Sequence, residues 1–156
     1  MNTKDYLEQI LVLQRLVYCL DRRIEYRKDK LYQIGSPSFE PSNNTSRSTE
    51  SRHAMKLMEI DELEDDRKKL MEMLCSLRRE MQQLFDTLDG EESCLMAYRY
   101  LDQRSIREIG QKTLISKSSV DRRIKGIVEA LKLPEGAYDV EKELIQAGLE
   151  RYLSWL

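Results

Sequence analysis

The 156-residue sequence contains few aromatic residues, prolines and glycines. Aromatic side chains make up 7% of it, and there are three prolines and six glycines, whereas charged residues make up 35%. This composition is typical of long, solvent-exposed helices rather than of sheets. No run of about 18 apolar residues, the length that a membrane-spanning helix needs, is present, and the N-terminus lacks an apolar signal core. We therefore expect an all-α, cytoplasmic protein without a membrane partner.

Cysteine and histidine are also scarce. Cys19, Cys75 and Cys94 lie far apart and lack the CxxC spacing of a metal site. We expect reduced thiols that pack as small hydrophobic residues. His53 is the only histidine, and no nucleophile, base and orienting group stand together in a catalytic pattern. We therefore predict a protein that is not an enzyme and that has no catalytic site, metal or cofactor.

Two long segments carry the periodicity of paired helices. Apolar residues recur at alternating intervals of four and three along residues 2–34 and again along residues 54–88, which is typical of the seam of a coiled coil. The segment between them, residues 35–52, is rich in serine and asparagine and contains two prolines, so it is predicted to be an exposed loop. Two helices joined by one loop most simply form an antiparallel hairpin, and we assign it to residues 1–89.

Charged residues within the two seams suggest a register for this hairpin. One arginine interrupts each seam, at Arg27 and at Arg67. An antiparallel pairing places Arg27 near Asp61 and Glu64, and Arg67 near Asp21. A two-helix hairpin buries little apolar surface, so it needs a third partner. That partner is either the C-terminal helices or a second copy of the chain, and we favour the second copy, which would make a homodimer through the hairpin.

The charge of the chain is unevenly distributed. The formal net charge is −2, yet residues 104–125 hold seven basic and two acidic side chains. Residues 35–90 hold eight basic and twelve acidic side chains, and residues 134–156 hold two basic and five acidic ones. A basic segment within an acidic protein is typical of a surface that binds a polyanion. The overall negative charge therefore does not exclude nucleic acid.

The basic segment has the pattern of a helix-turn-helix. Residues 105–131 read as two short helices joined by a tight turn, with Ser116 at the position of an N-cap for the second helix. Val120, Ile124 and Ile127 define the buried side of that second helix. We predict a helix-turn-helix domain over residues 90–156, ending in an amphipathic helix over residues 138–156.

The second helix of this pattern carries most of the predicted contacts to double-stranded DNA. At 100° per residue, Ser118, Arg122 and Lys125 lie opposite the buried side. Arg122 is the best candidate for a guanine contact and Asp121 for a cytosine contact, whereas Arg123 lies nearer the buried rim and is expected to pair with an acid. A merely solvated basic face is the alternative interpretation, but the charge cluster coincides with the turn. The predicted DNA-binding residues are Arg104, Ser105, Ser116, Lys117, Ser118, Ser119, Asp121, Arg122 and Lys125.

Residues 91–132 resemble region 4 of bacterial sigma factors, the module that reads the −35 promoter element. The shared pattern is a helix ending in Tyr100-Leu101, followed by Ser105-Ile106, by Glu108-Ile109-Gly110 and by a Ser-capped second helix. The whole chain resembles the small sigma-like regulators of phages and prophages of Gram-positive bacteria, of the ArpU/RinA kind. This resemblance implies a phage gene activator that acts as a dimer near promoters in the bacterial nucleoid and contacts RNA polymerase.

The chain departs from this family at the turn, where Thr113-Leu114 replaces a leucine followed by glycine, asparagine or aspartate. A leucine in a left-handed conformation is costly, so we expect a wider or shifted turn.

The sequence is also compatible with two other functions. One is a small terminase subunit that packages DNA, and the other is a coiled-coil interaction protein, such as an anti-activator, that does not bind DNA.

Overall fold

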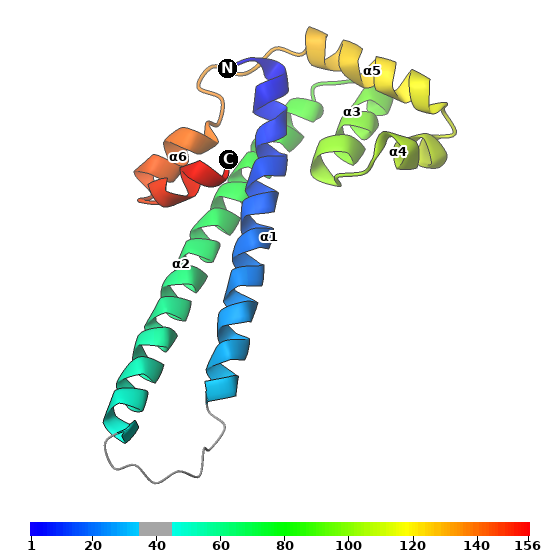
Figure 1. The fold of residues 1–156 in the computed structure, drawn as a ribbon. Coiled ribbons are helices and arrows are strands. Elements are labelled where there is room, and N and C mark those ends of the chain that lie inside the picture. The colour runs from blue at the N-terminus through cyan, green and yellow to red at the C-terminus, as the bar shows by residue number, and fades with distance from the viewer. Residues whose placement is uncertain (35–44) are drawn as a thin grey trace.

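The computed structural model describes residues 1–34 and 45–156, and these residues form helices and no strands. Two long helices, α1 (Thr3–Ile34) and α2 (Thr45–Phe85), run antiparallel as a hairpin (Figure 1). The remaining elements are shorter: α3 (Gly90–Met96), the π-helical turn η1 (Ala97–Leu101), α4 (Ile106–Thr113), α5 (Lys117–Ala130), α6 (Val140–Gln146) and the 3₁₀ helix η2 (Glu150–Trp155). The all-α prediction is confirmed. None of the described helices is long and apolar enough to span a membrane.

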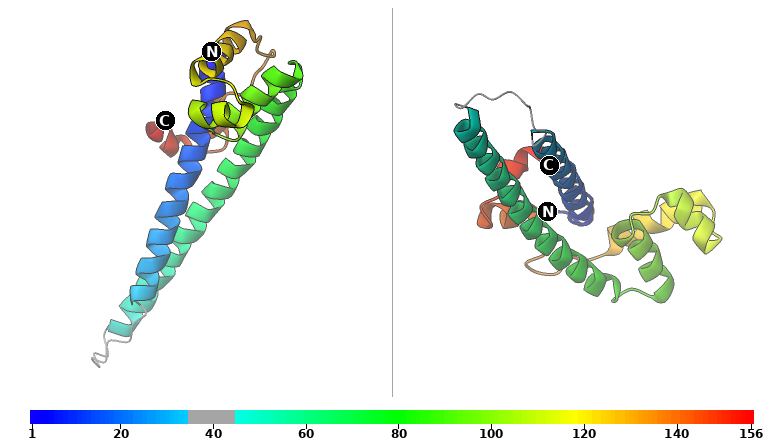
Figure 2. Two further views of the ribbon diagram at one scale, coloured as in Figure 1. Left: turned by 90° about the vertical axis from the view of Figure 1, so that its right-hand side faces the viewer. Right: turned by 90° about the horizontal axis from the view of Figure 1, so that it is seen from below.

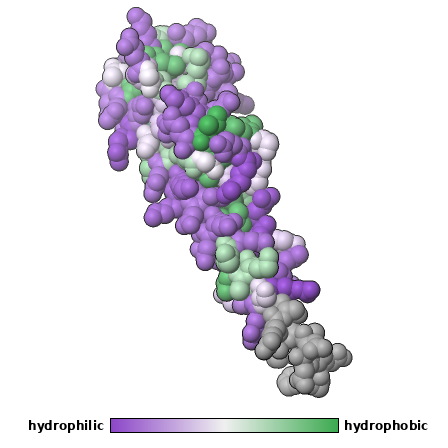
Figure 3. All heavy atoms as spheres, turned by 90° about the vertical axis from the view of Figure 1, so that its left-hand side faces the viewer, coloured by the Kyte–Doolittle hydropathy of each residue, from purple (hydrophilic) through white to green (hydrophobic). Residues whose placement is uncertain are grey.

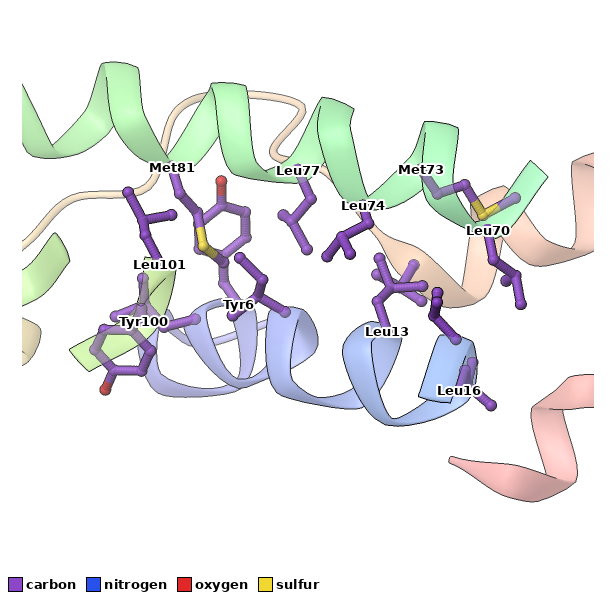
Figure 4. Close-up of a cluster of buried hydrophobic side chains, with 14 of the residues drawn as sticks. Tyr6, Leu13, Leu16, Leu70, Met73, Leu74, Leu77, Met81, Tyr100 and Leu101 are labelled. Atoms are coloured by element: carbon purple, nitrogen blue, oxygen red, sulfur yellow. The ribbon is translucent and has the colours of Figure 1, made fainter. Parts of the chain in front are cut away.

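The hairpin core follows the predicted apolar seam. Figure 4 shows Leu13 and Leu74 between the two long helices, with Tyr100 and Leu101 of η1 at one end. Burying a leucine stabilises a fold by about 1.5–3 kcal/mol relative to leaving it exposed. The seam residues of α1 that are buried are Tyr6, Ile10, Leu13, Val17, Leu20, Ile24 and Leu31, and those of α2 are Ile60, Leu70, Leu74, Leu77 and Met81.

Ion pairs across the hairpin test the predicted register. Arg67 pairs with Asp21, as expected. Arg27 pairs with Glu59 rather than with Asp61 or Glu64. Glu64 instead forms an ion pair with Lys28, at 2.7 Å between Nζ and Oε1, and this pairing raises the pKa of the lysine. The register is thus close to the predicted one, with Arg27 pointing toward the turn of α2 that precedes Ile60.

The second long helix begins earlier than expected. Its first residue is Thr45, so residues 45–52 belong to α2 and not to the predicted loop. These eight residues contain no proline or glycine, the two residues that disfavour a helix most. Serine and threonine lower helix propensity only slightly, so the helix can extend through them. The part of the predicted loop over residues 35–44 lies outside the described residues.

The elements α3 to α5 form a head at one end of the hairpin. η1 contacts α1 and α2, and α3 contacts α5, so the head and the hairpin share a continuous core. The side chain of Asp89 caps α3 by accepting a hydrogen bond from the amide of Glu92 at 2.9 Å. Arg78 of α2 donates a hydrogen bond to the carbonyl of Leu101 at 2.9 Å. The head and α6 lie on opposite sides of the hairpin (Figure 2).

The C-terminal segment packs on the hairpin as two short helices, not as the single amphipathic helix predicted for residues 138–156. The chain turns at Gly148, whose φ of 71° is a left-handed conformation that glycine adopts without strain. The amide of Leu149 then donates to the carbonyl of Leu144 at 2.8 Å, which closes the end of α6. Ile145, one position after the buried Leu144, is exposed, and so is Leu156, which follows η2.

The three cysteines correct another prediction. Cys19, Cys75 and Cys94 are free thiols, but all three are exposed rather than packed in the core. Each stands one position away from a buried leucine, so the rotation of 100° per residue turns it out of the core.

The surface seen from the side of α6 is largely hydrophilic, with smaller hydrophobic areas (Figure 3). Exposed apolar residues of α2 near the described end of the hairpin are Met55, Leu57 and Met58.

Candidate functional site

Helix α4 begins with a complete capping box. The Ser105 hydroxyl accepts a hydrogen bond from the amide of Glu108 at 3.2 Å, and the Glu108 carboxylate accepts one from the amide of Ser105 at 3.3 Å. Two amides that the first turn would leave unpaired are thereby satisfied. Ile109 of α4 is fully buried. The capping box therefore defines where α4 begins, and Ile109 holds the helix on the head.

The turn between α4 and α5 is tight, which makes the prediction of a wider turn wrong. Leu114 adopts the left-handed conformation, with φ 58° and ψ 31°, and its side chain is 94% exposed. The helices approach closely here, because a Cβ added to Gly110 would lie 2.8 Å from the carbonyl oxygen of Ile115. Ser116 then caps α5 by accepting a hydrogen bond from the amide of Ser119 at 3.3 Å, as predicted. The lack of a side chain at Gly110 therefore permits the turn that Leu114 closes.

Helix α5 lies on the head through the side that its sequence predicts. Val120, Ile124 and Ile127 are buried, and α5 contacts α1, α3 and α4. The hydroxyl of Thr3 donates to the carbonyl of Leu131, just past the end of α5, at 3.1 Å. Arg123, at the rim of this buried side, pairs with Glu91 of α3, as expected. α5 is thus attached to the head and also to the first turn of α1.

The opposite side of α5 is exposed and basic. Lys117, Ser118, Arg122 and Lys125 are all exposed there. Lys125 pairs with Asp121 at 2.8 Å between Nζ and Oδ2, and this hydrogen bond raises the pKa of the lysine. These residues come from two turns of one helix whose orientation is set by its buried side. We call Lys117, Ser118, Arg122 and Lys125 the basic face.

Other predicted site residues have structural contacts. Ser105 and Ser116 are the N-caps of the two helices, and the Ser116 hydroxyl also donates to the Ser119 hydroxyl at 2.8 Å. Arg104 is half-buried, and its Nε is buried without a hydrogen-bond partner among the described residues. The structure therefore brings the basic face together, whereas Arg104 and Ser105 lie at the start of the preceding helix.

Two features of this region were not singled out as functional from the sequence. Gly110 determines how closely the two helices approach, and its place in the Glu108-Ile109-Gly110 pattern of the resemblance was the sequence signal for it. Glu129 is exposed and lies one turn beyond Lys125, on the same side of α5. The positive charge of the basic face therefore ends after Lys125.

Comparison of the chain with models of protein families, with curated proteins and with solved structures gives no match.

Proposed function

We propose that α4 and α5 form a helix-turn-helix and that the chain is a sequence-specific regulator of transcription that binds double-stranded DNA. The observation that carries this proposal is the two-sided character of α5. One side is buried against three other helices, and the opposite side presents three cations and a serine to solvent. A helix held in this way can enter the major groove without unfolding any of its contacts.

The side chains of the basic face suit different contacts with a duplex. Lys117 stands at the first position of α5, where the backbone amides also point outward, so it suits a phosphate. Arg122 lies in the next turn and forms no ion pair with another described residue. Its planar guanidinium can therefore donate two hydrogen bonds to one guanine. Ser118, between them, can contact a phosphate or a base edge.

Asp121 and Lys125, which pair with each other, can both contact DNA in the same major groove. Their ion pair is intrahelical and exposed, so either side chain can exchange its partner for DNA at little cost. Lys125 then suits a phosphate, and Asp121 can accept a hydrogen bond from cytosine. The acidic Glu129 follows one turn later. We therefore place the end of the DNA contact at Lys125.

The resemblance to sigma region 4 supports a role at promoters. On that basis we propose a gene activator of phage or prophage origin that acts with bacterial RNA polymerase. Leu114 stands where the family's pattern has glycine, asparagine or aspartate, and it adopts the left-handed conformation that those residues adopt readily, which supports this alignment. Two parts of that pattern have a physical role in this fold: Gly110 of Glu108-Ile109-Gly110 permits the close approach of α4 and α5, and Ser105 forms the capping box with Glu108.

Selection of bound sites from random DNA tests this function, followed by affinity measurements on the selected site. We expect Arg122→Ala to weaken binding by about 1–3 kcal/mol and to relax the preference at one base pair. Lys117→Ala should weaken binding to all sequences and reduce the salt dependence by about one counterion. Arg79→Ala is the matched control, since Arg79 is an exposed helical arginine on α2.

Two outcomes would reject the proposal. One is a selection that returns no preferred sequence, and the other is an Arg122→Ala variant that binds the preferred site as well as Arg79→Ala does. An interaction protein without DNA binding would then be favoured, because α1 exposes Tyr18, Tyr26 and Tyr32 to solvent. A ring-shaped assembly in the same preparation would instead favour the terminase-like function.

A further inference from the structure

The outer side of α1 carries an alternating row of tyrosines and cations. Tyr18, Arg22, Tyr26 and Lys30 follow one another at intervals of four residues, so they lie along one side of the helix. Arg22 lies over the Tyr18 ring, with 6.0 Å between Cζ and the ring centroid. Lys30 lies over the Tyr26 ring, with 4.7 Å between Nζ and the centroid. We call these four residues the tyrosine–cation stripe.

This stripe faces away from the hairpin core. The buried residues of α1, such as Leu20 and Ile24, lie on the other side of the helix. Tyr18 is 63% exposed and Tyr26 is 59% exposed, and the C-terminal helices pack elsewhere, with Trp155 against Arg23. Tyrosine and arginine are the residues most enriched at the energetic centres of protein interfaces. The described part of the chain thus leaves both tyrosines of the stripe largely open to solvent.

The order of residues in the stripe is complementary to itself when reversed. If two copies of α1 lie antiparallel, stripe against stripe, with the two-fold axis at the level of residue 24 along the helix, Tyr18 faces the partner's Lys30 and Arg22 faces the partner's Tyr26. Each cation is then held between its own tyrosine and a tyrosine of the other chain. Asp29, also exposed, lies within one turn of the partner's Arg22 in this alignment. The two-fold axis makes every contact twice and leaves no open end.

We propose that the tyrosine–cation stripe is a dimer interface and that its partner is a second copy of this chain, packed antiparallel through α1. The head contacts the first turns of α1, which begin 21 residues from the axis. At 1.5 Å per residue, the two heads are then separated by about 60 Å. Neighbouring half-sites one helical turn of DNA apart are only about 34–36 Å apart. Such a dimer would contact two separated DNA segments.

Sedimentation equilibrium of the full chain across a range of concentrations tests the interface. We expect a monomer–dimer equilibrium whose dissociation constant rises about tenfold or more in Tyr26→Ala. The matched control is Tyr32→Ala, because Tyr32 is a 78% exposed tyrosine of the same helix that lies off the stripe. Tyr26→Ala should retain the helical content of the parent chain, which circular dichroism checks. A monomer at every concentration, or equal effects of the two variants, would overturn the proposal.

Crosslinking through Cys19 tests the direction of packing. Cys19 is exposed and, in the antiparallel alignment, faces position 29 of the partner. In a chain carrying Cys75→Ser and Cys94→Ser, a short bismaleimide should join two copies only when Asp29→Cys is added. Crosslinking through Cys19 alone indicates a parallel pair, and a higher oligomer by mass indicates an open or ring-shaped contact; either result rejects the antiparallel dimer. The proposed dimer interface does not include α5, so a chain that fails to bind DNA would not contradict the dimer.

Discussion

The hydroxyl of Tyr152 donates a hydrogen bond to the carboxylate of Asp66, 86 residues earlier in the chain, at 2.5 Å between Oη and Oδ2. The same carboxylate pairs with Arg151. Asp66 is 5% exposed and is the only buried charged residue of the described chain. A buried carboxylate is tolerated only when its lone pairs are satisfied. These contacts therefore attach η2 to the middle of α2.

Loss of the Asp66 carboxylate should release this attachment. We expect Asp66→Ala to lower the free energy of unfolding by about 1–3 kcal/mol, because the buried hydroxyl of Tyr152 loses its acceptor. Urea denaturation measures the change. Asp65→Ala is the control, since Asp65 is exposed and forms no ion pair with a described residue. Equal stabilities of the two variants would show that the attachment contributes nothing.

The left-handed residue in the α4–α5 turn should respond to glycine. Leu114→Gly relieves the clash between Cβ and the backbone and removes a side chain that packs on nothing, since it is 94% exposed. We expect the free energy of unfolding to rise by about 0.5–1 kcal/mol, the relief of strain outweighing the added freedom of the unfolded chain. Leu114→Ala keeps the Cβ and should give no such gain. Thermal or urea unfolding compares the two variants, and a gain in both would assign the effect to the exposed side chain instead.

Two glycines in the head should respond to alanine with opposite signs. Gly110→Ala places a Cβ 2.8 Å from a backbone oxygen, which cannot move without opening the turn, so we expect a loss of about 1–3 kcal/mol. Gly126→Ala, inside α5, meets nothing within 4 Å and should stabilise by about 0.5–1 kcal/mol. Both are measured by urea denaturation. A neutral Gly110→Ala would mean that the helices do not approach as closely as described.

Alkaline pH should destabilise the fold through two tyrosines beside Glu80. Burial, with the nearby carboxylates of Glu143 and Glu80, raises the pKa of Tyr138 from its usual 10.0 to about 12. Burial and a hydrogen bond to Glu80, at 2.7 Å, raise the pKa of Tyr6 still further. The unfolded chain therefore loses these protons first as the pH rises.

The contribution of these two tyrosines to the free energy of unfolding should accordingly be complete below about pH 10 and should fall as the pH rises from 10 toward 12. Urea denaturation at a series of alkaline pH values measures the slope. Tyr138→Phe removes one titrating group and should make the slope shallower. An unchanged slope in that variant would assign the alkaline loss to other residues.

The hairpin and the α4–α5 pair were largely predictable because their determinants are local. Apolar spacing identified the buried seam from Tyr6 to Leu31, and Ser105 and Ser116 marked the helix starts that the structure confirms. Arg67 and Asp21 paired as expected, whereas Arg27 pairs with Glu59, because several acids of α2 lie within one or two turns of that position. The contacts of the basic face with DNA remain a prediction.

Other features depended on contacts that the local pattern does not encode. Leu114 occupies a conformation that its side chain disfavours, since the packing of α4 on α5 outweighs about 1 kcal/mol of strain. Gly148 divides the last helix because the segment must fold back onto α2, where Asp66 accepts its hydrogen bonds. The cysteines were expected in the core by residue type, yet their positions on the helices turned them outward.

The amino-acid sequence by itself determined the two long helices, α4 and α5, and the sides that these four helices bury, because capping and periodicity act within a few residues. Tertiary structure decided where the C-terminal segment lies and how tightly the α4–α5 turn closes. These choices have a common physical reason. Each requires contacts between residues far apart in the chain, such as Thr3 with Leu131 and Asp66 with Tyr152, whose energies appear only when the chain is folded.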